Sequence, residues 1–97
     1  MEIEKLAEHA QAATHLLKQL SNDKRLMICC CLGAEELSVS ELNQKVPLSQ
    51  SALSQHLAKL RSANLLTTRR ESQTIYYRLA DENVLKIITT LKEIYCP

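Results

Sequence analysis

The sequence predicts a mainly helical domain that carries one small β-hairpin. Its 97 residues include one Gly and two Pro, a composition that favours long helices joined by short connections. Hydrophobic residues make up 45% of the chain, and the only aromatic residues are three tyrosines, so the core must be aliphatic. Apolar residues recur with a helical period except at 64–79, where the residue types become those of strands. We therefore expect one domain over residues 1–97.

Two helices are expected before residue 34. The first is amphipathic and covers 3–20, with apolar side chains at helical spacing: Ile3, Leu6, Ala7, Ala10, Ala13, Leu17 and Leu20. The letters "SND" at 21–23 can cap a second helix, and Gly33 is its natural end. The apolar residues of this second helix, which include three consecutive cysteines, cover every direction around its axis. That distribution is typical of a buried central helix.

Residues 38–63 are expected to form a helix-turn-helix. Ser38 or Ser40 can cap a short helix, which Pro47 ends because its ring nitrogen cannot donate to the helical hydrogen-bond ladder. Ser49 can cap the next helix. That helix has one apolar stripe, made by Leu53, Leu57 and Leu60. Two short helices joined by a tight turn are typical of this motif.

Residues 64–79 are expected to form a β-hairpin, called the wing below. The segments "LLTTRR" and "TIYYRLA" are rich in β-branched and aromatic residues, and "ESQ" separates them. Because the connection has neither Gly nor Asn-Gly, we expect a turn longer than two residues.

A last helix is expected at 81–95, with Asp81 as its cap. Its apolar face comprises Val84, Ile87, Ile88, Leu91, Ile94 and Tyr95. The order of elements predicts a winged helix-turn-helix with amphipathic helices at both ends. We expect the N- and C-terminal helices to form a homodimer interface, because readers of paired DNA half-sites are dimers. The alternative is that both apolar faces pack on the domain's own core.

Positive charge is concentrated around the predicted wing. The whole chain has a net charge of only +1, but the segment 59–78 holds five basic residues and a single glutamate. A local basic patch of this kind favours contact with nucleic acid.

The helix after Pro47 and the wing supply the candidate DNA-contacting residues. Gln55 can read adenine through two hydrogen bonds, and Arg69 and Arg70 can hold phosphates or enter the minor groove. The full set of candidates is Gln50, Ser51, Ser54, Gln55, His56, Lys59, Arg69 and Arg70. An ordinary polar solvent face is the alternative for the helix and a soluble charged hairpin for the wing. His56 can instead be a half-buried histidine that is hydrogen-bonded within the motif.

The first twenty residues contain charges and no apolar run long enough for export or membrane insertion. We therefore expect a cytoplasmic protein without a membrane partner. Cysteines in that compartment stay mostly reduced and are more often metal-binding or redox-active than structural. The chain has four of them: Cys29, Cys30, Cys31 and Cys96.

The block "LSQSALSQHLAKLRSANLLTTRRESQTIYYRLA" closely resembles the recognition helix and wing of ArsR/SmtB-type regulators. "NDKRLMICC" resembles the start of the second helix in the same family, and the resemblance covers nearly the whole chain. It implies a dimeric bacterial repressor that binds an inverted-repeat operator in double-stranded DNA and leaves it when an inducer binds.

The ligands of the family's usual metal sites are missing. Ser38 and Ser40 stand where arsenic- and cadmium-sensing members have cysteines, and the last helix has no histidine. The resemblance therefore implies no metal and no cofactor. Cys30 in "RLMICC" and Cys96 in "IYC" are placed as in the sulfide- and persulfide-responsive, BigR/SqrR/HlyU-like subgroup.

That placement implies that Cys30 and Cys96 sense sulfane sulfur. Cys29 and Cys31 are interpreted as core residues, because free cysteine behaves as a small hydrophobe.

Three alternatives remain at the level of the sequence. The chain could be a metal-sensing or anti-silencing ArsR-type regulator, or a winged-helix module that has lost DNA binding. The third alternative is a thiol-based redox enzyme. Because a thiol enzyme needs an accessible, low-pKa cysteine beside a positioned base, and no histidine lies near Cys30 in sequence, we expect no enzyme.

Overall fold

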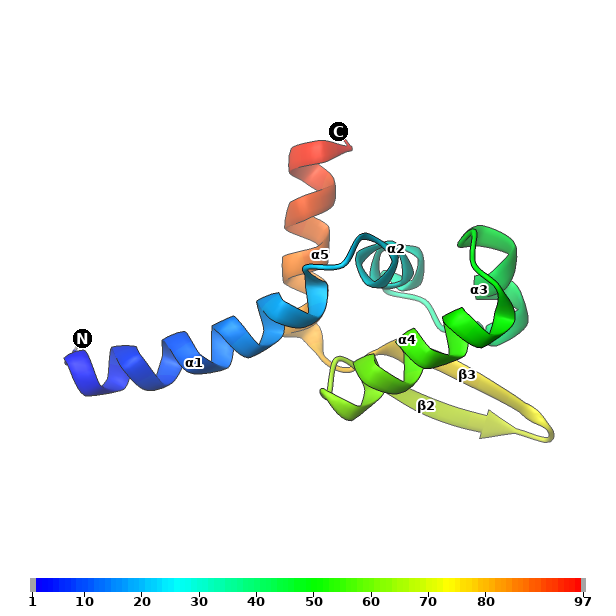
Figure 1. The fold of residues 1–97 in the computed structure, drawn as a ribbon, viewed down its shortest axis with the longest axis horizontal. Helices are drawn as coiled ribbons and strands as arrows, with labels where there is room; N and C mark the ends of the chain where they lie inside the picture. Colours follow the sequence, from blue (N-terminus) through cyan, green and yellow to red (C-terminus); the bar gives the residue numbers. More distant parts are fainter. Residues whose placement is uncertain (1, 97) are drawn as a thin grey trace.

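The computed structural model describes residues 2–96, which form five helices and a three-stranded sheet (Figure 1). The elements are, in order, α1 Ile3–Leu20, α2 Asp23–Leu32, β1 Leu37–Ser38, α3 Val39–Lys45, α4 Gln50–Ser62, β2 Leu66–Glu71, β3 Thr74–Leu79 and α5 Glu82–Tyr95. This is the winged helix-turn-helix that the sequence predicts.

Helix α2 is the centre of the domain. It packs against α1, α3, α4, α5 and β3, and it buries Ile28, Cys29 and Leu32 almost completely. The side chain of Asn22 caps its start by accepting hydrogen bonds from the backbone N–H groups of residues 24 and 25. Gly33 ends it with a positive φ of 52°, a conformation that glycine adopts without steric cost. The predicted central helix is confirmed.

The helix-turn-helix consists of α3 and α4. Of the two predicted caps for α3, Ser38 is the one used, in a reciprocal capping box with Glu41. The turn between the helices contains no glycine, and the side chain of Asn43 stabilises it by donating a 2.8 Å hydrogen bond to the carbonyl of Leu48. Ser49 caps α4. The predicted stripe of α4 is fully buried, at Leu53, Leu57 and Leu60.

The wing differs from its sequence prediction in two respects. First, β2 and β3 pair antiparallel with Glu71 opposite Thr74, so the turn contains two residues rather than more. Ser72 makes this possible by adopting a positive φ of 58°, the role that glycine or asparagine usually fills. Second, the sheet has a third strand: β1 pairs antiparallel with β3 on the side away from β2. Two residues carry no alternation pattern, so β1 was not predictable.

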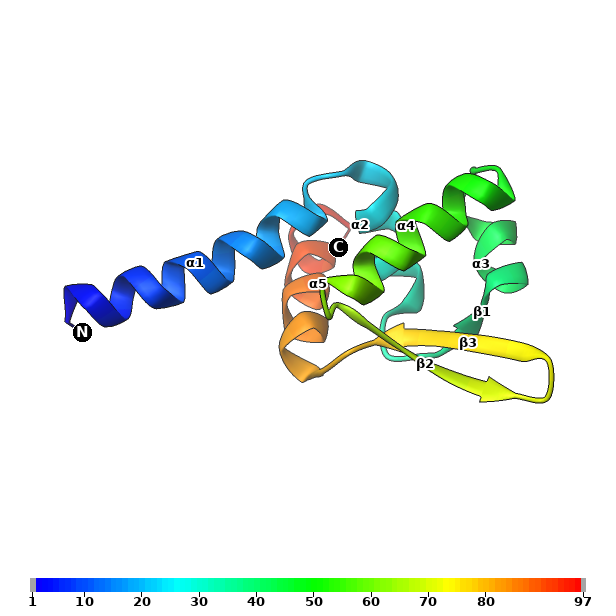
Figure 2. The same ribbon diagram turned by 60° about the horizontal axis from the view of Figure 1, so that its bottom comes forward.

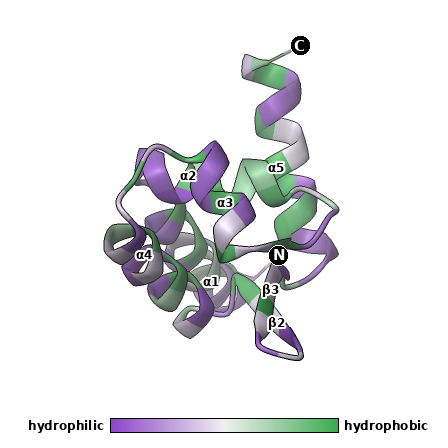
Figure 3. Ribbon diagram, turned by 90° about the vertical axis from the view of Figure 1, so that its right-hand side faces the viewer, coloured by the Kyte–Doolittle hydropathy of each residue, from purple (hydrophilic) through white to green (hydrophobic). Residues whose placement is uncertain are grey.

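The two terminal helices leave much of their apolar surface uncovered. Helix α1 projects away from the rest of the domain (Figures 1 and 2), and only Leu20 at its end is buried. Ile3 is 69% exposed and Leu17 is 58% exposed. Helix α5 buries Val84 and Ile88 but continues beyond the body, and hydrophobic residues recur along its protruding part (Figure 3). The exposed face of α1 excludes the alternative in which both apolar faces pack entirely on the domain's own core.

No helix in the described part of the chain is both long and apolar enough to cross a membrane.

Candidate nucleic-acid interface and cysteine pair

Helix α4 presents a continuous polar face on the side opposite its buried leucines. All the polar candidates on this helix except His56 are exposed: Gln50, Ser51, Ser54, Gln55 and Lys59. Short side chains on this face, including the exposed Ala58, allow the helix backbone to approach another surface closely. The dimensions of an α-helix match the major groove of B-form DNA, so this face has the shape and chemistry of a recognition surface.

His56 is only partly exposed, and its side chain is held within the domain. The Nε of Arg25 donates a 3.3 Å hydrogen bond to Nδ1 of His56, and Nη1 of Arg25 donates to Gln19 at 2.9 Å. Burial lowers the pKa of His56, the nearby charges of Arg25 and Lys59 lower it further, and Asp23 opposes this. His56 is therefore the half-buried, hydrogen-bonded histidine of the second interpretation.

Arg25 is a candidate phosphate contact that the sequence analysis missed. It lies at the start of α2, but the hydrogen bond to His56 holds it beside α4. Together with Lys59 and His15 it lines a pocket of about 350 Å³ between α1, α2 and α4. A basic residue thirty-one positions upstream could not be assigned to this face from its spacing alone, because the juxtaposition arises from the packing of α2 on α4.

The two wing arginines have different environments. Arg69 forms ion pairs with Glu36 and Glu71, and its guanidinium lies 4.8 Å from the centre of the Tyr76 ring. The hydrogen bonds from Arg69 hold the pKa of the Glu36 carboxyl below its usual value. Arg69 therefore ties the wing to the segment that precedes β1.

Arg70 is exposed and points from the opposite face of β2, because side chains alternate along a strand. The ion pairs found within residues 2–96 all involve Arg69, so Arg70 has no carboxylate partner among these residues. Of the two arginines, Arg70 is the one available to a phosphate.

A groove of about 800 Å³ separates the start of α4 from the wing and brings several predicted residues together. Gln50 lines it from α4, Arg69 from β2 and Gln73 from the turn. Of the predicted DNA-contacting residues, Gln50 and Arg69 border this groove.

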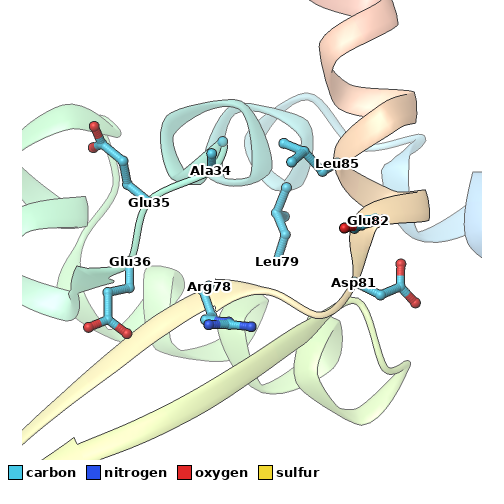
Figure 4. A pocket seen from close by; sticks show the side chains of 9 residues that line it. Ala34, Glu35, Glu36, Arg78, Leu79, Asp81, Glu82 and Leu85 are labelled. Atoms are coloured by element: carbon cyan, nitrogen blue, oxygen red, sulfur yellow. The ribbon is translucent and has the colours of Figure 1, made fainter.

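Another pocket, of about 440 Å³, has a lining rich in carboxylates (Figure 4). It lies between the end of α2, β3 and the start of α5, and four carboxylates contribute to its lining: Glu35, Glu36, Asp81 and Glu82. Arg78 is the only basic residue in the lining. Within residues 2–96 no three His, Cys, Asp or Glu side chains are grouped so that they could hold a metal ion. This acidic surface would repel a phosphate backbone.

The three consecutive cysteines of α2 differ in burial because successive helical residues point about 100° apart. Cys29 is fully buried, Cys30 and Cys31 are half-buried, and all are reduced thiols. Burial raises the pKa of Cys29 to about 12, with a smaller contribution from the neighbouring Cys30. Cys29 is thus a core residue as expected, whereas Cys31 only packs against the edge of the core.

Cys30 and Cys96 belong to two elements that pack against each other, α2 and the end of α5. Cys96 is exposed and directly follows α5, with its backbone N–H donating a 2.7 Å hydrogen bond to the carbonyl of Lys92. Burial raises the pKa of Cys30, the positive charge of Lys92 lowers it, and the thiols of Cys31 and Cys96 raise it. Cys96 is therefore one of the groups that raise the pKa of Cys30.

The helix-turn-helix domain family HTH_20 matches residues 20–69. The chain is 52% identical to the nodulation protein NolR of Rhizobium meliloti over 88 residues, which are 91% of this chain and 72% of NolR. It is 45% identical to the transcriptional activator HlyU of Vibrio cholerae over 96 residues, 99% of this chain and 89% of HlyU.

Solved structures with the same fold extend these similarities. Reduced HlyU from Vibrio cholerae superposes with a TM-score of 0.93 at 44% identity, covering 98% of this chain and 100% of HlyU. The transcriptional repressor BigR from Xylella fastidiosa gives 0.88 at 37% identity, covering 100% and 99%. A homodimeric winged helix-turn-helix DNA-binding domain from Mycobacterium bovis gives 0.81 at 26% identity, covering 97% and 86%.

The burial of the four cysteines predicts their order of reaction with a small alkylating agent. In the folded, reduced chain, iodoacetamide at pH 8 should modify the exposed Cys96 first and the half-buried Cys30 and Cys31 more slowly. Cys29 should react only when the chain unfolds, because the thiolate is the reactive form and burial suppresses it. Mass spectrometry of peptides from a time course measures the order. Early labelling of Cys29 in folded protein would contradict the burial described above.

Proposed function

The chain belongs to the ArsR-type family of winged helix-turn-helix transcriptional regulators, and we propose that it is a homodimer that leaves its operator when Cys30 and Cys96 react with sulfane sulfur. Its relatives are DNA-binding regulators rather than enzymes, which removes the thiol-enzyme alternative. They include one named as an activator and one named as a repressor, so the proposal concerns release from DNA and not the sign of regulation. We propose that it acts in the cytoplasm, where its DNA partner is.

The observation that carries the proposal is the pairing of one thiol on the central helix with one at the end of a terminal helix. Cys30 is on α2, which contacts every other helix, and Cys96 follows α5, which has unpaired apolar surface. A covalent bridge between them would join the core to a helix expected to lie at the dimer interface.

The chemistry requires no reagent other than the inducer. The Cys30 thiolate attacks the outer sulfur of a persulfide RSSH, so that a new Sγ–S bond forms and RS⁻ leaves with the electron pair of the broken S–S bond. A second RSSH converts Cys96 in the same way. The Cys30 persulfide anion then attacks Sγ of Cys96 and displaces HS⁻, which leaves a trisulfide bridge. The sulfane sulfur of the inducer is the oxidant in each step.

A bridge of this kind would bias the position of α5 relative to α2. In a dimer built on α1 and α5, that change alters the separation of the two α4 helices. Recognition helices of a dimer must match half-sites about 34 Å apart, so even a modest displacement weakens binding. Formation of the bridge and binding of the operator are thus coupled through the geometry of the dimer.

The second copy of this chain is the occupant that fits the exposed apolar residues of α1 and α5. A domain of this size buries a limited core and often completes it by association. Leu6 is 49% exposed on α1, and Tyr95 is 78% exposed on α5. The structurally similar Mycobacterium bovis domain is homodimeric, which supports a homodimer here.

For DNA, we propose that the exposed face of α4 reads bases and that Arg70 and Lys59 contact phosphates. The ion pairs of Arg69 with Glu36 and Glu71 support a different role for that residue, in which it fixes the wing at the angle needed for Arg70 to reach the duplex. Arg25 supports the phosphate contacts from the other side of α4.

Substitutions on this surface should distinguish residues that contact bases from residues that contact phosphates. Gln55→Ala should weaken operator binding by roughly 1–3 kcal/mol and relax the preference at one base position. Arg70→Ala should weaken binding to all sequences and lower the salt slope by about one. Fluorescence anisotropy at several salt concentrations measures both. Lys86→Ala, a loss of the same charge from an exposed position on α5, is the matched control and should bind normally. Wild-type behaviour of both test variants would refute this interface.

The cysteine proposal is tested by comparing all four thiols. Reduced protein should bind operator DNA, and glutathione persulfide should weaken binding at least tenfold while adding an intramolecular Cys30–Cys96 link visible by mass spectrometry. Cys30→Ser and Cys96→Ser should bind DNA but not respond, because either change prevents the bridge. Cys29→Ala and Cys31→Ala should still respond. If Cys96 proves dispensable and the triplet essential, the two-thiol switch is wrong.

The dimer interface is tested by a charge placed on α1. Leu17→Glu should dissociate the dimer without unfolding the protomer, because Leu17 is 58% exposed within one chain and contributes little to its own core. Sedimentation velocity and circular dichroism measure the two effects. Ala12→Glu adds the same side chain to the opposite side of α1 and should remain dimeric. A Leu17→Glu variant that still sediments as a dimer would exclude α1 from the interface.

A further inference from the structure

Lys92 is a half-buried lysine on the turn of α5 that precedes Cys96. Its Nζ lies 3.7 Å from the point that a Cβ would occupy on Gly33, and this point is 3.9 Å from the carbonyl oxygen of Cys30. The ammonium group therefore lies at the end of α2, next to the turn that carries Cys30. No carboxylate within residues 2–96 forms an ion pair with it.

We propose that Lys92 is a positioning residue that stabilises the Cys30 thiolate and so activates it toward sulfane sulfur. The proposal rests on the two-thiol function described above. Lys92 extends from α5 to the end of α2, near the backbone carbonyl of Cys30. Because Cys96 follows the same helix, one element supplies both the second thiol and the positive charge. When Cys30 ionises, its proton passes to solvent and the ammonium remains charged.

The charges around Cys30 leave Lys92 as its only stabilising partner. Burial raises the pKa of the thiol, and the neighbouring thiols of Cys31 on α2 and Cys96 after α5 also raise it. Lys92 alone lowers it. Lys92 thus favours the thiolate form, on which a nucleophilic cysteine depends.

A purely structural interpretation of Lys92 is that it neutralises the partial negative charge at the end of α2. This interpretation predicts a loss of stability when Lys92 is removed, but no change in the pH dependence of Cys30. The two interpretations are therefore separable by measuring the reaction of Cys30 as a function of pH.

The experiment follows iodoacetamide modification of Cys30 by peptide mass spectrometry between pH 6 and 11 in the reduced, full-length dimer. In Lys92→Gln the midpoint for Cys30 should move upward by about half to one pH unit. At pH 7 the thiolate fraction then falls roughly three- to tenfold. Because a more basic thiolate is also more nucleophilic, the net rate should fall about two- to threefold. At a pH above both midpoints, where Cys30 is ionised in both proteins, the variant should react faster than wild type because its thiolate is more nucleophilic.

Two matched variants complete the test. Lys92→Arg keeps the charge and should keep the wild-type midpoint, whereas Lys86→Gln removes a charge from an exposed position on the same helix and should have no effect. A thermal melt of each variant monitors folding. An unchanged Cys30 midpoint in folded Lys92→Gln would overturn the proposal, as would failure of Lys92→Arg to restore it.

The same variants treated with glutathione persulfide distinguish this inference from the proposed function. Formation of the Cys30–Cys96 link at pH 7 should be about two- to threefold slower in Lys92→Gln. If the alkylation midpoint shifts but persulfide forms no link in wild type, the sensing function is wrong and the role of Lys92 stands. If the link forms at equal rates in both proteins and the midpoints agree, the role of Lys92 is wrong and the sensing function stands.

Discussion

The burial of α2 determines the position of every other element of the domain. This helix contacts all four of the others and one strand, and Ile28 and Leu32 are enclosed on all sides. After its charged first turn, this ten-residue helix has only apolar residues, so its neighbours surround that part. The cysteine triplet is compatible with this environment because a reduced thiol packs as a small hydrophobe. Cys30 lies at the edge of the core on this helix. A chemical change at its thiol can therefore affect the packing of the elements that contact α2.

The recognition surface depends on this packing and on one exposed ion-pair network. The leucines of α4 turn its polar face outward, and Arg69 connects the wing to Glu36 just before β1. Because Glu36 lies only a few residues beyond the end of α2, the segment that carries the cysteines is joined by a short connection to the wing. The wing is therefore linked to the helix of the cysteines through the Arg69–Glu36 ion pair and this short connection.

The proposed regulation depends on the two terminal helices. α1 contributes Leu20 to the core and leaves most of its remaining apolar face exposed, while α5 carries Lys92 and leads to Cys96 outside the core. Elements that are only partly packed move at low free-energy cost. A covalent change at the end of α5 can thus alter an interface between protomers without unfolding the protomer itself.

The helices, their caps and the winged-helix order were predictable from the sequence, because helical periodicity and capping residues are local signals. The sequence also identified the exposed residues of α4 and the buried state of Cys29. Tertiary structure decided what depends on residues far apart in the chain. It placed Arg25 beside His56, paired Arg69 with Glu36, and added β1 to the sheet. It also brought Lys92 to the end of α2, because only the packing of α5 against α2 defines which of the chain's charges lies near a given thiol.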